Sequence, residues 1–361
     1  MSHPSLQHPL LEQEFAVLDH GSIMLVDFMG TEEDIVRSAR NSYKKGTKHV
    51  SDDETLLRYL MRHRHTTPFE RCQIAFHVKL PIFVERQWAR HRTAGWNEVS
   101  GRYSELPEET YVPEPEDVCL QSKTNRQGRA EQAGVEQFTQ FLKHCELATQ
   151  TAFNGYHADL ENDIARETAR INLPLSTYTE KTWWVNLHNM LNFLSLRMDS
   201  HAQKEVRVYA DILGNEIIAK LFPKSWQAFL DYRLNAVTLS GPEWQIFGKV
   251  LNAVGMTAEE LSRLCGDRVL WPENASQRER NELAEKIGRL GSLILNELRK
   301  TLDLERNARA EVLFRSEVLA GRIQFRLRLD GANWRMPFTV ETNLPVGARV
   351  LAGRDGTPVG K

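Results

Sequence analysis

Residues 72–103 read CQIAFHVKLPIFVERQWARHRTAGWNEVSGRY, and their pattern sets the architecture that we expect. Apolar side chains alternate with more polar ones over the first nine residues, which predicts a β-strand with one buried face. Pro81 follows, and because proline suits the first position of a helix, we expect a helix from there to about Arg92. Two glycines in residues 93–103 indicate a loop after this helix.

The residues on either side of this stretch predict further strands and helices. A short apolar run at residues 22–28 predicts a second buried strand. Thr31 comes before three acidic side chains, the pattern of a capped helix start, and predicts a helix over residues 31–43. Further helices are expected at 53–63, 130–160, 162–171, 178–222, 241–255 and 277–304. We therefore expect the α+β class, with a mixed or antiparallel sheet packed against long helices and the helix 178–222 in the core.

The last part of the chain has a different pattern. From Glu311 onward, short β-like runs are separated by glycine and proline, which predicts a small β-rich tail. We divide the chain into a main domain, residues 1–235, a helical extension, residues 236–305, and this tail, residues 306–361. No role for the tail follows from its residues.

Composition and charge exclude several classes of protein. Hydrophobic residues make up 41% of the 361 residues and charged residues 26%, as in an ordinary globular protein. No apolar run reaches the roughly 20 residues of a membrane helix, and the N-terminus has no signal-peptide pattern. The formal net charge of -2 and the acidic segment 105–117 count against a nucleic-acid-binding module, which would have a strongly basic domain. The four cysteines form no CxxC pair, so we expect no metal site and a reducing, cytoplasmic location.

A cationic cluster lies at the end of the helix predicted after Pro81. Residues 90–92 read Arg-His-Arg, and such a run is tolerated on a solvated surface or opposite an anion. The following loop adds Asn97, Glu98 and the sequence Ser-Gly-Arg at 100–102. Arginine forks, a serine hydroxyl and loop N–H groups together suit a phosphate.

Two other interpretations of this cluster stay open. It could be a solvated basic helix end followed by a polar loop. Alternatively, Ser100 could be a nucleophile with His91 as its base. A loop that binds phosphate is the simpler explanation.

Two further segments carry candidate site residues. Residues 65–70 read HTTPFE, which by itself indicates a turn that contains His65. Arg197 lies in a largely apolar run, so we expect its charge to have a specific partner. Asn186 lies eleven residues before Arg197, which would place both on one face of the predicted long helix. The apolar side of that helix is expected to face the core and consists of Trp184, Leu187, Leu191, Leu194 and Met198.

Three patterns together resemble the flavin-dependent thymidylate synthases. They are the Arg-His-Arg triplet followed by seven residues and Ser100, the HxTPFE-like segment at 65–70, and N-x5-N-F-L-x-L-R-x-D-S-H-A-Q-x-E from Asn186 to Glu205. The resemblance covers about residues 20–235, so the main domain is expected to be catalytic. It implies reductive methylation of dUMP to dTMP, with 5,10-methylenetetrahydrofolate as carbon donor, FAD as hydride source and NADPH as reductant. It also implies a homotetramer with sites shared between subunits.

The resemblance assigns roles to individual residues. Arg197 would be catalytic, because it would bind the uracil and favour ionisation of N3. The residues expected to bind dUMP are Gln87, Arg90, Glu98, Ser100, Gly101, Arg102, Arg170 and Arg197. The residues expected to bind FAD are His65, Thr67, Arg90, His91, Arg92, Asn97, Glu98, Asn186, His188, Asn192 and His201. The chain departs from the family at His188, where many relatives have arginine, and a neutral histidine would hold the FAD phosphates less well.

The chemistry that the resemblance implies needs no cysteine nucleophile. Cys72 begins the predicted strand among apolar residues and is expected to be a buried structural thiol. An arginine at the uracil edge would stabilise the N3-deprotonated, enolate-like ring, and the flavin would supply the hydride. The chain has no GxGxxG fingerprint, so NADPH is expected to enter the same pocket. Two alternatives stay open: a relative that binds FAD or nucleotide without turnover, and a uridylate-binding flavoprotein with another acceptor.

Overall fold

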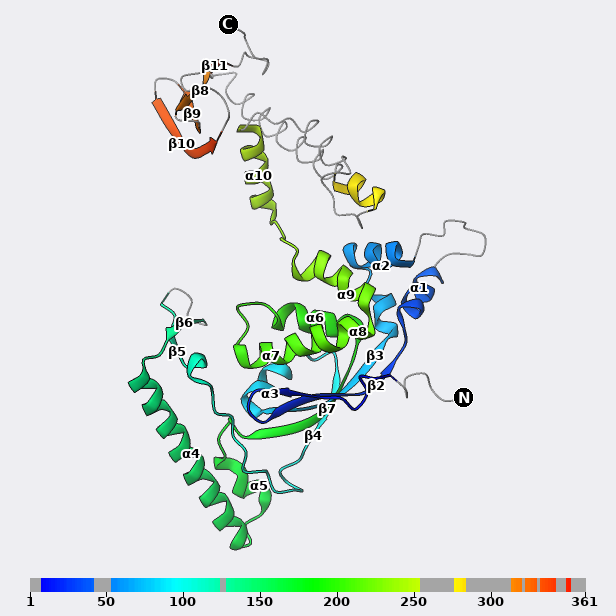
Figure 1. Ribbon diagram of the computed structural model, residues 1–361, viewed down its shortest axis with the longest axis vertical. Coiled ribbons are helices and arrows are strands. Elements are labelled where there is room, and N and C mark those ends of the chain that lie inside the picture. The colour runs from blue at the N-terminus through cyan, green and yellow to red at the C-terminus, as the bar shows by residue number, and fades with distance from the viewer. Residues whose placement is uncertain are drawn as a thin grey trace. The chain divides into compact units, whose positions relative to one another are not determined.

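The computed structural model describes residues 8–41, 53–123, 128–253, 276–283, 313–319, 322–329, 332–341 and 349–351. These residues belong to two compact units, 1–236 and 237–361. The first unit contains a sheet with the helices that cover it, and the second contains helical segments and a small sheet (Figure 1). The predicted α+β class is therefore confirmed. The roles expected for the main domain, the extension and the tail stay predictions.

A five-stranded antiparallel sheet is the framework of the first unit. Its strands follow the order β1 (Glu14–Val17), β2 (Gly21–Met29), β3 (Gln73–Pro81), β7 (Tyr178–Asn186) and β4 (Gly95–Glu98). The strands predicted at 22–28 and 72–80 are confirmed as β2 and β3. Along β3, Ile74, Phe76 and Val78 are buried and the residues between them are half-buried, as the alternating pattern predicts. Strand β4 lies inside the segment that we expected to be a loop.

Helices complete the core against this sheet. They are α1 (Glu32–Arg40), α2 (Asp53–Arg62), α3 (Ile82–Trp88), α6 (Leu187–Arg197), α7 (Lys204–Ile212) and α9 (Pro223–Phe229), with the 3-10 helix η2 (Thr67–Arg71). Figure 1 shows α6 and α7 over one side of the sheet. The ring of Trp88 in α3 lies 5.0 Å from that of Trp183 in β7 and 4.7 Å from that of Phe193 in α6, centre to centre. This aromatic cluster fixes how α3, β7 and α6 pack together.

The prediction of a single long helix over residues 178–222 is wrong. Residues 178–186 form strand β7, which is followed by α6, a turn, α7, the π-helix η5 (Leu213–Ile218) and α8 (Ala219–Leu221). Two buried positions of β7 hold the polar residues Thr179 and Lys181, so the strand's alternation is hidden in the sequence. Trp184, which we expected to face the core, is 46% exposed.

Other predicted helices are present with different ends. Helix α2 agrees closely with the predicted 53–63, and α1 ends at Arg40. Helix α3 ends at Trp88, so the Arg-His-Arg triplet lies in the turn after the helix and not in its last turn. The helix expected at 162–171 is reduced to α5 (Arg166–Ala169) and the 3-10 turn η4 (Arg170–Asn172).

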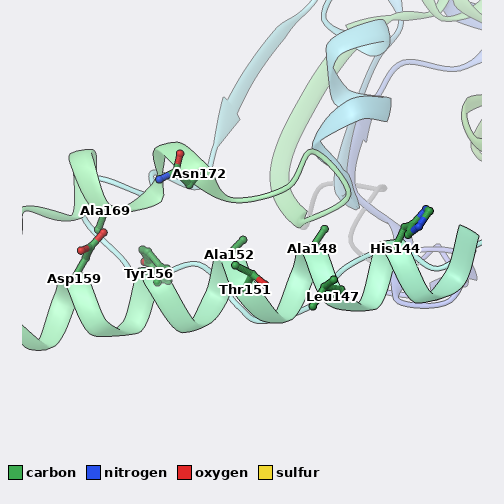
Figure 2. A pocket seen from close by; sticks show the side chains of 10 residues that line it. His144, Leu147, Ala148, Thr151, Ala152, Tyr156, Asp159, Ala169 and Asn172 are labelled. Carbon is green, nitrogen blue, oxygen red and sulfur yellow. The ribbon is translucent and has the colours of Figure 1, made fainter.

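Helix α4 (Val135–Glu161) has few contacts with the rest of the first unit (Figure 1). Of its 27 residues only Phe153 and Tyr156 are buried, and they pack with Ala169 of α5. An open pocket beside α4 is lined by His144, Leu147, Ala148, Thr151, Ala152, Gly155, Tyr156, Asp159, Ala169 and Asn172 (Figure 2). No residue of the predicted dUMP or FAD sets lines this pocket, so the candidate chemistry lies elsewhere.

The second unit contains helix α10 (Gly241–Ala253) and a short helical segment at 277–283. The rest of the helix predicted at 277–304 lies outside the described residues. The strands of its antiparallel sheet follow the order β10 (Ala332–Glu341), β9 (Arg322–Leu329), β8 (Leu313–Leu319) and β11 (Arg349–Leu351). The predicted β-rich tail is confirmed. Across the described parts of both units, no helix has the length and apolar character that crossing a membrane requires.

Candidate active site

Arg197, at the last residue of α6, is held by two neutral acceptors. Its Nε–H donates to Nε2 of His91 over 2.9 Å, and its Nη2–H donates to the backbone oxygen of Gln87 over 3.1 Å. We expected a specific partner for this charge, and the structure provides hydrogen-bond acceptors but, among the described residues, no carboxylate. The guanidinium is thus fixed in direction while its positive charge stays uncompensated, which suits it to an anionic ligand.

His91 stays neutral in this environment. Burial, followed by the charges of Arg197 and Lys181, lowers its pKa to about 4. Because Nε2 accepts the hydrogen bond from Arg197, Nδ1 carries the proton in the neutral ring. The lone pair that a general base would use is therefore already engaged.

The Ser100 hydroxyl, in the loop after β4, forms a hydrogen bond with the loop's own backbone. The Oγ of Ser100 accepts the backbone N–H of Arg102 over 3.3 Å, and no hydrogen bond joins it to His91 within the described residues. Gly101 is buried, and a Cβ added there would come within 3.0 Å of Cδ and 3.1 Å of Nη1 of Arg170. A larger residue at this position would require the Arg170 side chain to shift by a few tenths of an ångström. The structure therefore brings four members of the predicted dUMP set together: Ser100, Gly101, Arg102 and Arg170.

Arg102 already has an ion-pair partner. Its Nε lies 2.9 Å from Oε2 of Glu167 in α5, and both side chains are more than half exposed. An exposed pair of this kind contributes little stability. A phosphate can therefore replace Glu167 at small cost.

Strand β4, at the edge of the sheet, places Asn97 and Glu98 beside β7. Glu98 lies opposite Lys181 of β7 in the register, and its Oε1 accepts the hydroxyl of Thr179 over 2.9 Å. Gly95 allows this pairing, because a Cβ there would lie 2.3 Å from the ring of Trp184. The β4 loop is thus anchored at both ends before it reaches Ser100.

A buried ion pair that we did not predict lies beneath β4. Lys181 of β7 and Glu85 of α3 are 2% and 4% exposed and form an ion pair, with the Lys181 ammonium 4.5 Å from the centre of the Trp88 ring. Burial lowers the pKa of Lys181 to about 8 and raises that of Glu85, so desolvation outweighs their mutual attraction. The signal was a lysine at an inward position of a strand, and the helix expected for residues 178–222 concealed it.

Gln87 and the turn after α6 form the other side of the Arg197 group. The side-chain amide of Gln87 donates to Oε1 of Gln203. Glu205, in the first turn of the next helix, α7, is buried, and each of its carboxylate oxygens accepts a hydrogen bond from Nη2 of Arg129 over 2.6 Å. Glu205 of the family pattern therefore holds the hairpin of β5 (Cys119–Gln121) and β6 (Arg129–Gln132) against α7.

A second group of predicted residues lies at the N-terminal half of α6. A small pocket there is lined by Leu60, Met61, Arg64, His65, Thr66, Phe69, His188, Leu191, Asn192, Phe229 and Arg233. It brings together His65, His188 and Asn192 from the predicted FAD set. Burial lowers the pKa of His188, so its ring is neutral at pH 7. Thr67 begins η2 next to this pocket.

Several predicted contacts are placed differently from our expectation. Asn186 is the N-cap of α6, and its Oδ1 accepts the backbone N–H of Asn189 over 2.9 Å, so it does not share a helix face with Arg197. His201 is exposed in the turn before α7, with Nδ1 2.8 Å from Oδ1 of Asp199. Arg90 and Arg92 are exposed at the surface. Within one chain the structure thus shows three sets of predicted residues: those around Arg197, those of the loop 100–102 with Arg170, and those of the pocket at the N-terminal half of α6.

Cys72 is a structural thiol. It is fully buried, its Sγ–H donates to the backbone oxygen of Thr31 over 3.5 Å, and burial raises its pKa to about 12. A thiol of this kind is not a nucleophile at neutral pH. The expectation of a buried structural cysteine is confirmed.

Known proteins resemble this chain over most of its length. Residues 24–224 match the family model described as thymidylate synthase complementing protein. Flavin-dependent thymidylate synthases from Wolbachia pipientis wMel and Treponema denticola are each 47% identical, over 251 and 256 residues, which are 70% of this chain and 88% and 96% of those proteins. A crystal structure of the UMP/dUMP methylase PolB from Streptomyces cacaoi, bound with 5-Br dUMP, aligns with a TM-score of 0.55 and 32% identity, covering 61% of this chain and 99% of that one.

Proposed function

The chain belongs to the family of flavin-dependent thymidylate synthases, enzymes that methylate dUMP to dTMP, and we propose that Arg197 is its catalytic residue. The observation that carries this assignment is the geometry of Arg197, whose guanidinium is fixed by two neutral acceptors and keeps its full charge. A preorganised cation at the uracil edge stabilises the N3-deprotonated, enolate-like ring and so makes C5 nucleophilic. No cysteine attack on C6 is needed, in agreement with the buried thiol of Cys72.

The loop after β4 would hold the nucleotide. Arg170 and the N–H groups and hydroxyl of residues 100–102 would bind the phosphate, supported by the close approach of Gly101 to Arg170. Gln87 would contact the nucleoside because it lies next to Arg197. Glu98 would do so because it is the last residue of β4, the strand that leads to the loop. Arg90, the remaining residue of the predicted dUMP set, is exposed and therefore accessible to the nucleotide.

The side chains that line the pocket at the N-terminal half of α6 suit contacts with part of a flavin dinucleotide. It combines the apolar side chains of Leu60, Leu191 and Phe229 with the polar groups of His188 and Asn192, as a cofactor with an aromatic ring and charged phosphates requires. When bound, the flavin supplies the hydride for the reduction. We propose FAD as the flavin, NADPH as its reductant and 5,10-methylenetetrahydrofolate as the carbon donor.

The remaining predicted FAD ligands lie outside this pocket. They are Thr67, Arg90, His91, Arg92, Asn97, Glu98, Asn186 and His201. A homotetramer in which a site draws residues from more than one subunit would bring such separated groups together, and we propose that assembly. A cytoplasmic location is also proposed, supported by the free thiols of Cys72, Cys119 and Cys145.

The direct test is turnover by the purified protein. We expect a flavin absorbance spectrum and dTMP formation from dUMP, 5,10-methylenetetrahydrofolate and NADPH. In Arg197→Ala, kcat should fall by about 100- to 1000-fold, the usual effect of removing a group that stabilises a developing anion. Lys220→Ala, which removes an exposed cation of an i,i+4 pair, is the control and should keep full activity. Flavin binding without dTMP formation by the wild-type protein would contradict the proposed activity.

A further inference from the structure

Two arginines line the flavin pocket without a negative partner. Arg64 follows α2 and Arg233 lies in the π-helix η6 (Leu230–Leu234), and both line the pocket that also contains His188. Within the described residues neither forms an ion pair. Burial, followed by the charge of Arg64, lowers the pKa of Arg233, in agreement with the position of both side chains at one pocket. Two like charges at one pocket are unfavourable unless an anion binds between them.

The backbone of Arg64 is strained. Its φ is +57°, in the left-handed region, and its N–H donates to the oxygen of Met61 over 3.2 Å while His65 N–H donates to Leu60 over 2.9 Å. This pair of bonds is the usual end of a helix at which glycine occupies the left-handed position. An arginine here destabilises the fold relative to glycine, so its presence indicates a use for the side chain.

Arg233 also lies in unusual backbone. The turn Leu230–Leu234 is π-helical, and the N–H of Asn235 donates to the oxygen of Leu230, five residues earlier, over 2.9 Å. Such turns are rare and occur frequently at functional sites. Both arginines of the pocket therefore lie where the chain departs from ordinary helix geometry.

We propose that Arg64 and Arg233 bind the diphosphate of the flavin dinucleotide. The inference rests on the proposed function of this pocket. Two guanidinium forks match an anion with two charged centres, since each fork can bind two oxygens. In FAD each of the two linked phosphates carries one negative charge, so each guanidinium can pair with one phosphate. The neutral ring of His188 contributes no charge, so these two residues provide the positive charge of the pocket.

The test compares two flavins in the full-length protein. FAD contains the diphosphate and riboflavin has no phosphate, so dissociation constants for both are measured by flavin fluorescence on protein freed of cofactor. Arg64→Gly and Arg233→Met should each weaken FAD binding by about 10- to 100-fold, as expected for loss of a charged hydrogen bond, and leave riboflavin binding nearly unchanged. The melting temperature of cofactor-free Arg64→Gly should equal or exceed that of the wild type, because glycine removes the strain. Arg37→Ala, which removes an exposed arginine of α1, is the matched control for lost charge.

Different outcomes contradict the diphosphate assignment and the proposed function on which it rests. FAD affinity in both variants equal to that of Arg37→Ala would overturn the diphosphate assignment, and so would equal losses for FAD and riboflavin. Wild-type protein that binds no flavin would contradict the proposed function itself. If Arg233→Met does not fold, Arg64→Gly still decides, since that change relieves strain.

Discussion

The buried pair Lys181–Glu85 and the pocket pair Arg64–Arg233 use charge in opposite ways. Lys181 and Glu85 have opposite signs, contact each other and are almost completely shielded from water. Arg64 and Arg233 have the same sign, and within the described chain no carboxylate accompanies them. The first pair is complete as folded, so its loss should reduce stability. The second pair has no negative charge beside it in the folded chain, so its loss should reduce the binding of an anionic ligand. Arg197 is similar to this second pair, because its charge also has no carboxylate partner among the described residues.

The largest effect that tests this contrast is expected at Lys181. Lys181→Met leaves the Glu85 carboxylate buried without a partner, which should lower the free energy of unfolding by about 3–5 kcal/mol. Urea denaturation of the cofactor-free protein measures the change. The double variant Lys181→Met/Glu85→Leu should recover most of the loss, because two apolar side chains can replace a buried ion pair. A single variant as stable as the wild type would show that the pair does not support the fold.

A smaller effect is expected at His91, whose ring is kept neutral by burial and by the charges of Arg197 and Lys181. Its pKa is about 4 in the folded chain and near the ordinary 6.5 in the unfolded chain. Between these values the unfolded chain binds a proton that the folded chain does not bind, so the free energy of unfolding should fall as the pH is lowered from 6.5 to 4. His91→Gln keeps an acceptor for Arg197 but cannot titrate, and its decline over that range should be shallower. Equal slopes for the two proteins would mean that His91 does not have the lowered pKa.

The smallest effect is expected at Asn186, which combines a structural and a proposed binding role. Asn186→Ala removes the N-cap of α6 and should cost about 1 kcal/mol of unfolding free energy. Asn186→Asp keeps the cap, and its stability should match the wild type, but it loses the amide donors and should bind FAD more weakly. Denaturation and flavin fluorescence on both variants measure the two roles separately. Unchanged FAD affinity in Asn186→Asp would leave Asn186 with the cap alone.

Strand β3 and strand β7 show what could be predicted from sequence. In β3 the buried positions are apolar, so period two was visible and the strand was predicted at nearly the correct bounds. In β7 the buried positions include Thr179 and Lys181 while Trp184 faces out, so the apolar residues happened to match helical spacing. A polar residue that is buried because it has a partner elsewhere in the chain cannot be recognised from local periodicity.

The same limit applies to the site. Arg197 and the loop at residues 100–102 were found because they belong to family patterns, and their surroundings agree with a site for an anion. Arg64 and Arg233 were missed because they are far apart in the sequence and only the fold brings them to one pocket. Glycine at 64 would have indicated the left-handed helix end, whereas arginine there gives no local signal.

Helix α4 has a further consequence for motion. Its 27 residues correspond to a rod of about 40 Å, and it is fixed to its own unit by Phe153 and Tyr156, both in its C-terminal half. The N-terminal half has no buried residue, so its amide protons should exchange with solvent at rates close to those of an isolated helix. The exchange pattern along α4 in solution will therefore show whether that half of the helix stays exposed or is covered.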